Sequence, residues 1–225
     1  MNFVTRCILT TAFAFAAVVL GDAAHATGDI SKVNGSVKVE AGQQAGDVDT
    51  VNGSVTVGAH ARAGRIETVN GSVKIEDTAV VISAATVNGS ITVGAGAQVS
   101  EAIEAVNGSL TLRKGARVAG GLENVNGAML LDGAQVDGGL DTVNGDIRLA
   151  TGTILKGGIH VNEHKSSWWR GKDSRNPRIT VEQGATVEGP LRFEREVDLY
   201  VAPGVNLPPV EGVQPQRFTL QQGRG

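Results

Sequence analysis

The sequence predicts an all-β fold, a single-stranded parallel β-solenoid with triangular coils of 18–19 residues. One observation is a short motif, V-N-G-S, which recurs at near-constant spacing and continues as V-N-G-A, V-N-G-D and V-N-E. A second is that apolar residues keep the same place in every repeat. A third is that no aromatic residue occurs between residues 27 and 160. A fixed short period over most of a chain is typical of stacked coils rather than of a globule.

The asparagine of the motif sets the phase of the repeat, with steps of 18 or 19 residues: Asn34, Asn52, Asn70, Asn88, Asn107, Asn126 and Asn144, with Asn162 following in the same phase. After each asparagine, two apolar positions flank a polar one, which is the period of a strand with one buried side. The apolar columns are Val37, Val55, Val73, Ile91, Leu110, Met129 and Ile147, and Val39, Val57, Ile75, Val93, Leu112, Leu131 and Leu149.

Two further sets of apolar positions predict two further sides of the coil. One set precedes the motif: Ile30, Val48, Ile66, Ile103, Leu122 and Leu140. The other consists of small or β-branched residues, among them Ala61, Ala63, Ala79, Val81, Ala97, Val99, Ala116 and Val118. Each coil is therefore expected to contain three short strands joined by corners. With ~4.8 Å between stacked strands, nine or ten coils form a rod about 45 Å long.

The Asn-Gly pair is expected to form one corner, because both residues tolerate a positive φ. Other glycines, such as Gly58, Gly64, Gly115, Gly120 and Gly121, are expected at the remaining corners. The alternative is a hairpin turn between antiparallel strands. Parallel stacking is favoured because residue identity repeats from coil to coil. The missing aromatics further suggest an interior too thin for rings.

The ends of the chain predict export. Arg6 followed by an apolar stretch at residues 7–20 and an A-H-A sequence at 24–26 are typical of a cleaved signal peptide. Cys7, the single cysteine, lies within it, so no disulfide is expected. The formal net charge of −3 argues against nucleic acid as a partner.

The expected organisation is a signal peptide at 1–26, a solenoid at 27–162, an insertion at 163–178, terminal coils at 179–205 and a proline-rich tail at 206–225. The insertion departs from the repeat and concentrates different chemistry. Its candidate binding residues are Trp168, Trp169, His164, Lys165, Arg170, Lys172, Arg175 and Arg178. Such residues suit stacking on a sugar ring, contact with anionic headgroups or docking of a protein. The alternative is a structural flap.

The recurring V-N-G-S-[VIL]-x-[VIL] resembles a bacterial β-strand-repeat domain family of unknown function that is described as adhesin-like. Two stretches between residues 115 and 140, G-A-R-V-A-G-G-L and G-A-Q-V-D-G-G-L, are similar to coils of bactofilins, which form cytoskeletal polymers. The first resemblance implies an exported protein with a surface or envelope role. The second implies head-to-tail assembly through the end coils. Neither family supplies a catalytic motif.

Other candidate chemistry is weaker. The asparagine column is expected to be a structural turn ladder, since stacked amides stabilise stacked strands, although N-G-S also matches a glycosylation sequon. An acidic column, Asp49, Glu67, Glu104, Glu123 and Asp141, is interrupted by Ala85 and suggests a solvated face, or else a cation between Glu104, Glu123 and Asp141. His60 and His160 lie about 26 Å apart along the predicted axis, too far to share a zinc ion.

The sequence therefore predicts an exported, non-enzymatic β-solenoid with a structural or adhesin-like role at the bacterial cell envelope. It is expected in the periplasm or at the cell surface, with no cofactor and no metal. The expected partners are an envelope glycan, lipid or protein, and the end coils of a second copy. A bactofilin-like scaffold polymer is the alternative, and a carbohydrate-active or hexapeptide-type enzyme is a remote one.

Overall fold

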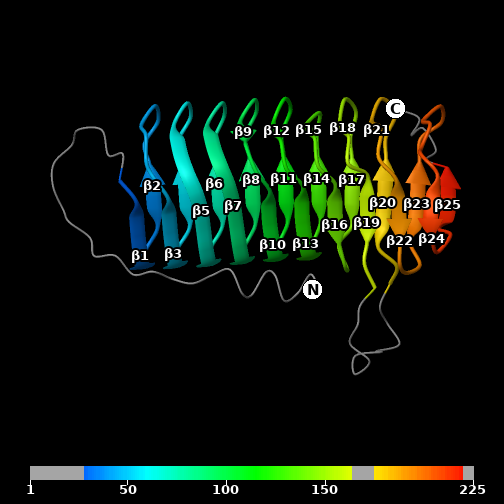
Figure 1. The fold of residues 1–225 in the computed structure, drawn as a ribbon, viewed down its shortest axis with the longest axis horizontal. Helices are drawn as coiled ribbons and strands as arrows, with labels where there is room; N and C mark the ends of the chain where they lie inside the picture. The colour runs from blue at the N-terminus through cyan, green and yellow to red at the C-terminus, as the bar shows by residue number, and fades with distance from the viewer. Residues whose placement is uncertain (1–27, 164–174, 220–225) are drawn as a thin grey trace, which may run out of the picture.

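The computed structural model describes residues 28–163 and 175–219 as a rod of stacked β-coils. The coils follow one another along the long axis, from β1 at one end to β25 at the other (Figure 1). Within the described residues there is no helix long and apolar enough to cross a membrane. The predicted all-β parallel solenoid is confirmed.

The three sides of the coil form three parallel stacks of strands, which we name face 1, face 2 and face 3. Face 1 contains β1 (Ile30–Asn34), β3 (Val48–Asn52), the second halves of β5 (Arg62–Asn70) and β7 (Val80–Asn88), β10 (Ile103–Asn107), β13 (Leu122–Asn126), β16 (Leu140–Thr142), β19 (Ile159–Val161), β22 (Leu191–Phe193) and β24 (Val210–Gly212).

Face 2 contains β2 (Val37–Val39), β4 (Val55–Val57), β6 (Val73–Ile75), β8 (Ile91–Val93), β11 (Leu110–Leu112), β14 (Met129–Leu131), β17 (Ile147–Leu149), β20 (Arg178–Val181), β23 (Asp198–Val201) and β25 (Gln216–Thr219). Face 3 contains the first halves of β5 and β7, then β9 (Gln98–Val99), β12 (Arg117–Val118), β15 (Gln135–Val136), β18 (Ile154–Leu155) and β21 (Thr186–Val187).

The strand register follows the sequence repeat. Ile30 pairs with Val48, and Val48 with Ile66, so each residue lies beside its equivalent in the next coil. All named strand pairs are parallel, and the hairpin alternative is therefore wrong. Identical residues stack on one another because they occupy identical positions in neighbouring coils.

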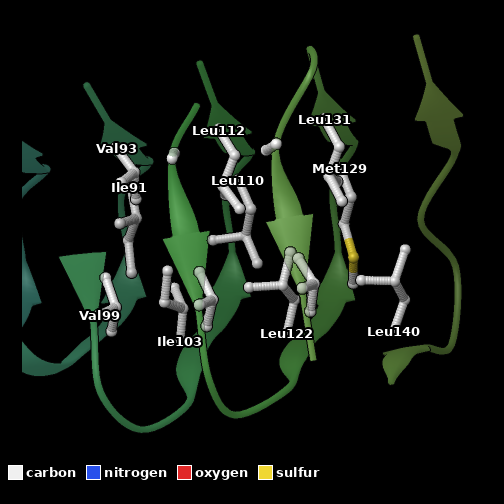
Figure 2. Close-up of a cluster of buried hydrophobic side chains, with 14 of the residues drawn as sticks. Ile91, Val93, Val99, Ile103, Leu110, Leu112, Leu122, Met129, Leu131 and Leu140 are labelled. Carbon is white, nitrogen blue, oxygen red and sulfur yellow. The ribbon is translucent and has the colours of Figure 1, made fainter. Parts of the chain in front are cut away.

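The predicted inward columns form the core. Residues such as Val55, Ile66 and Leu110 have no exposed surface, and the expected third set, from Ala61 to Val118, is also buried. Figure 2 shows Ile91, Leu110 and Met129 along one wall facing Ile103, Leu122 and Leu140 along another, while Val93, Leu112 and Leu131 continue the first wall. Most of the stabilisation therefore arises between neighbouring coils, as in other repeat proteins.

The expectation that the interior excludes aromatic rings is wrong in one terminal coil. Phe193 is 1% exposed and belongs to the core. Its column neighbours are Val161 on one side and Gly212 on the other.

The glycine of the Asn-Gly corner is required for close stacking of the coils as well as for the conformational freedom that was expected. A Cβ at Gly71 would lie 1.9 Å from the carbonyl oxygen of Gly53, and one at Gly89 would lie 2.0 Å from that of Gly71. Among described non-glycine residues, a positive φ occurs at His60 and Thr78, so the motif asparagines do not adopt it. Among the motif glycines, Gly35 has a φ of 105° and Gly127 one of 138°. Close stacking of backbones and, in some coils, a positive φ therefore both fix this glycine column.

The solenoid continues beyond the boundary expected at residue 205. β24 pairs with β22 and β25 pairs with β23, which adds strands to faces 1 and 2 within the stretch expected to be a tail. The prolines suggested a tail, but Pro208, Pro209 and Pro215 lie between strands. In these places they remove no ladder hydrogen bond.

Candidate functional site

The candidate site is the place where the insertion interrupts the coil, at the corner between faces 1 and 2. Ile147 of β17 pairs with Ile179 of β20, 32 residues further along the chain. Thr142 of β16 pairs with Val161 of β19, so residues 162–178 stand where other coils have the four residues V-N-G-S. With V-N-G-S in their place, the sequence from Val161 to Val181 would be V-V-N-G-S-I-T-V, whose last seven residues are identical to residues 87–93. The insertion is therefore an addition to one corner of an otherwise regular coil.

An asparagine ladder runs along this same corner and ends at the insertion. Each amide Nδ2 donates to the Oδ1 of the asparagine in the preceding coil, at 3.0–3.1 Å, from Asn144 back to Asn34. Asn162 does not continue the ladder, and its Nδ2 lies 3.5 Å from the carbonyl oxygen of Thr142. Instead, Arg195 Nη1 donates to Asn144 Oδ1 at 2.7 Å and to the Val143 carbonyl at 3.3 Å.

The charge of Arg195 suits the end of the ladder at which it lies. The amide dipoles are aligned, so their carbonyl ends all point toward the insertion. A guanidinium at that end is electrostatically favourable. Sequence reasoning missed Arg195 because it lies 51 residues beyond Asn144.

Asp146 holds the end of the insertion that returns to the rod. It occupies the serine position of V-N-G-S, and its carboxylate accepts two hydrogen bonds from the Arg175 guanidinium, at 2.9 and 2.8 Å. It also accepts the backbone N–H of Arg178 at 2.9 Å. Burial alone would raise the pKa of Asp146, but the bonds from Arg175 and from the Arg178 amide together lower it. The V-N-G-D variant is thus an anchor for the insertion.

Glu194 holds the other end. Its Oε2 accepts the backbone N–H of Glu163 at 3.0 Å, and its Oε1 lies 3.3 Å from His160 Nε2. His160 Nδ1 in turn lies 3.1 Å from Asp141 Oδ1. The chain therefore leaves the rod beside a row of polar contacts on face 1. The ion pairs are partly exposed, so they position the chain more than they stabilise it.

The two described residues of the predicted binding loop have anchoring contacts. Arg175 bonds to Asp146, and the Arg178 guanidinium carbon lies 5.0 Å from the ring centroid of Tyr200, a cation–π geometry. Tyr200 stacks on Phe218 with centroids 4.7 Å apart. The other six predicted binding residues lie outside the described residues: His164, Lys165, Trp168, Trp169, Arg170 and Lys172.

The remaining sequence candidates lie elsewhere. The acidic column is a true column of face 1, with Glu104 beside Glu123 and Glu123 beside Asp141. His60 lies at the corner after face 2, whereas His160 lies on face 1. Among the described residues, no group of three or more His, Cys, Asp or Glu side chains is arranged to hold a metal ion.

Comparison with known proteins finds no matching family model, no matching curated protein and no matching solved structure. The class of this protein, a single-stranded parallel β-solenoid interrupted by one corner insertion, accordingly follows from its own fold.

Proposed function

We propose that this protein is an exported, non-enzymatic β-solenoid with a structural or adhesin-like role at the bacterial cell envelope. In this role the rod is a spacer and residues 163–178 contact a glycan, lipid or protein of the envelope. The observation that carries the proposal is the anchored insertion. One of the described coils carries these extra residues, and Asp146 and Glu194 attach its two ends to the rod.

The regularity of the rod supports a presenting role. Serine hydroxyls accept backbone N–H groups of the next coil, as in Ser72 N to Ser54 Oγ at 3.2 Å, beside the asparagine ladder. Buried threonines donate to glycine carbonyls across the corner, as in Thr68 Oγ1 to Gly53 O at 2.9 Å. Side-chain hydrogen bonds therefore link successive coils along the corner that carries the insertion. These bonds support a rigid attachment for the insertion.

The test replaces residues 162–178 with Val-Asn-Gly-Ser, which restores the four-residue spacing between Val161 and Ile179 and removes the insertion without breaking the coil. We expect the purified variant to keep its far-ultraviolet circular dichroism and to lose at least tenfold in retention on isolated envelope fractions. Trp168→Ala with Trp169→Ala should reproduce most of that loss. Unchanged retention in both variants would refute a role for the insertion.

Export has its own test. A tagged full-length chain should be recovered from the periplasmic or surface fraction, shortened by about the length of a signal peptide. A matched chain lacking residues 1–26 should stay with the cytoplasmic marker. Recovery of the full-length chain with the cytoplasmic marker would contradict the proposed location.

A second candidate is a bactofilin-like scaffold polymer, and the ends of the rod favour it. Within the described residues, β1 pairs with β3 alone and β2 with β4 alone, so one edge of each has no partner strand. An unpaired edge is a template for strand addition by another copy. Electron microscopy over a concentration series should show filaments with a repeat of one rod length. A monomer at every concentration would eliminate this candidate.

A further inference from the structure

The outer surface of face 1 carries two parallel columns of different character. Carboxylates form one: Asp49, Glu67, Glu104, Glu123 and Asp141. The leading valines of the motif form the other, two residues further along each strand: Val33, Val51, Val69, Val87, Val106 and Val125. Val33 is 42% exposed and Val87 36%, although valine is normally buried. A stripe of apolar side chains thus runs beside a stripe of negative charge for roughly 25 Å.

The acidic column is interrupted at Ala85, and this gap becomes a hollow. Ala85 pairs with Glu67 on one side and with Glu104 on the other. The short side chains of Ser83 and Ala85 leave a cavity of about 310 Å³. Its lining includes both glutamates together with Val69, Val87 and Val106. The hollow therefore has carboxylates on two sides and valine on a third.

The lining suits an organic cation better than a metal ion. A calcium ion needs six to eight oxygen ligands, whereas much of this lining is alanine and valine. A lysine or arginine side chain has an aliphatic stem that packs on apolar surface and a charged end that seeks carboxylates. In the hollow, the stem would lie against Val87 and the charge between Glu67 and Glu104.

The electrostatics of the surface also favour a positive partner. Burial, followed by repulsion from Asp49 and Asp47, raises the pKa of Glu67, and Arg65 offsets only part of this. Burial and then Asp47 likewise raise the pKa of Asp49. Arg65 is the one basic residue among those that line the hollow, and it lies 3.9 Å from Glu101. A cation supplied from outside would relieve this repulsion.

We propose that the outer surface of face 1 is a docking surface for a basic polypeptide segment of a partner protein, with the hollow at Ala85 as the seat of one lysine or arginine side chain. The alternation of charge and valine along each strand matches an extended segment that alternates basic and apolar residues. This surface is separate from the insertion and does not depend on the function proposed above.

The test uses a fluorescent peptide of alternating lysine and valine, with a matched peptide in which glutamine replaces lysine. Anisotropy titration should show binding of the lysine peptide alone. Ala85→Leu, which fills the hollow without changing charge, should weaken binding at least tenfold, as should Glu67→Gln with Glu104→Gln. Glu40→Gln is the control, because it removes an exposed carboxylate paired with Lys38 on another face.

Folding is controlled in the same variants. Circular dichroism should be unchanged, and Glu67→Gln should raise the thermal midpoint, since it removes a carboxylate that is repelled in the free protein. Equal binding of the lysine peptide by wild type and Ala85→Leu would show only nonspecific attraction to the acidic column. That result would overturn the proposed site at Ala85. Absence of lysine-peptide binding would also overturn it. So would a calcium site, shown by a thermal midpoint that calcium raises in the wild type, without any peptide, but not in Ala85→Leu.

Discussion

His60 and Thr78, at the corner between faces 2 and 3, have a left-handed backbone conformation that glycine adopts at the equivalent positions of other coils. Equivalent positions in other coils are glycines with positive φ, such as Gly96 at 66° and Gly115 at 76°. His60 and Thr78 adopt φ of 60° and 58° at this position, and Thr78 Oγ1 lies 2.6 Å from His60 Nδ1. A left-handed conformation costs about 1–2 kcal/mol for a residue with a Cβ, and it is most unusual for a β-branched one.

We therefore expect Thr78→Gly to raise the free energy of unfolding by about 1 kcal/mol, after the lost hydrogen bond to His60 is subtracted. The matched exchange, Gly96→Thr, should lower it by about 1–2 kcal/mol, because its Cβ would meet no atom closer than 3.5 Å and only the backbone is strained. Urea unfolding measures both. A destabilised Thr78→Gly would show that the side-chain contact outweighs the strain.

The asparagine ladder makes a second prediction about single residues. Asn88 donates to Asn70 at 3.0 Å and accepts from Asn107 at 3.1 Å, whereas Asn34, at the end of the ladder, accepts one bond from Asn52. Asn88→Ala should cost about 1–2 kcal/mol and Asn34→Ala about half as much, given about 1 kcal/mol per bond. Urea midpoints of the two variants provide the comparison. Equal losses would contradict a ladder in which each bond contributes.

Individual coils differ from one another through single substitutions at a shared position. The serine position is occupied by Ser36, Ser54, Ser72, Ser90 and Ser109, and by Asp146 in the coil that precedes the insertion. In the four coils from Ser36 to Ser90, the hydroxyl accepts one backbone N–H of the next coil. In the aspartate coil the carboxylate accepts the same kind of backbone bond and binds a guanidinium as well. One change of residue therefore converts a stacking contact into an anchor.

Asp146→Asn should lower stability in a pH-dependent manner. Because the pKa of Asp146 is lowered in the folded state, its contribution is present above the unfolded value near 4 and is lost as pH falls through the folded value. At pH 7 we expect the free energy of unfolding of the variant to be about 1 kcal/mol lower than that of the wild type. The loss is smaller than for a buried pair because solvent screens the charges. Urea midpoints from pH 7 to pH 3 should converge for wild type and variant. A loss of stability that does not change with pH would show that the negative charge of Asp146 is not its cause.

The whole molecule behaves as a stack in which each coil contacts its two neighbours. Val48, for example, lies between Ile30 and Ile66, and no single coil has a core of its own. Stability in such an array is close to a sum of neighbouring interfaces. The rod should therefore tolerate the removal of a complete coil but not of part of one.

Deletion of residues 71–88 provides the test at this scale. It joins Asn70 to Gly89 and preserves V-N-G-S-I at the junction. We expect a folded rod with native-like circular dichroism and a modestly lower urea midpoint, since one interface is lost. Deletion of residues 71–79 is the control, because it shifts the register and places polar residues in the core. Loss of structure in the full-coil deletion would contradict a modular stack.

The prediction of the core and the incomplete prediction of the site have different physical origins. Whether Ile66 or Leu110 faces inward is decided by alternation within one strand, which the chain shows locally. The pairings Asn144–Arg195, Asp146–Arg175 and Glu163–Glu194 join residues 51, 29 and 31 positions apart. The sequence does not show these pairings because the insertion breaks the phase. Only the strand register shows that Asn144 and Arg195 are equivalent positions two coils apart, each two residues beyond a paired residue, Thr142 and Phe193. The V-N-G-D variant was the one available signal, and it did not identify its partners.

The sequence by itself determined the fold class, the coil length and the inward columns, because each depends on a pattern that recurs within 18 or 19 residues. Only the tertiary structure decided what the exceptions do. Ala85 is a small change in one strand, and it becomes a hollow only when Glu67 and Glu104 are stacked on either side of it. Asp146 meets Arg175, and Arg195 meets Asn144 from two coils further along, only when the coils are stacked. Repetition specifies a rod locally, whereas contacts at a break in the repetition exist only between coils.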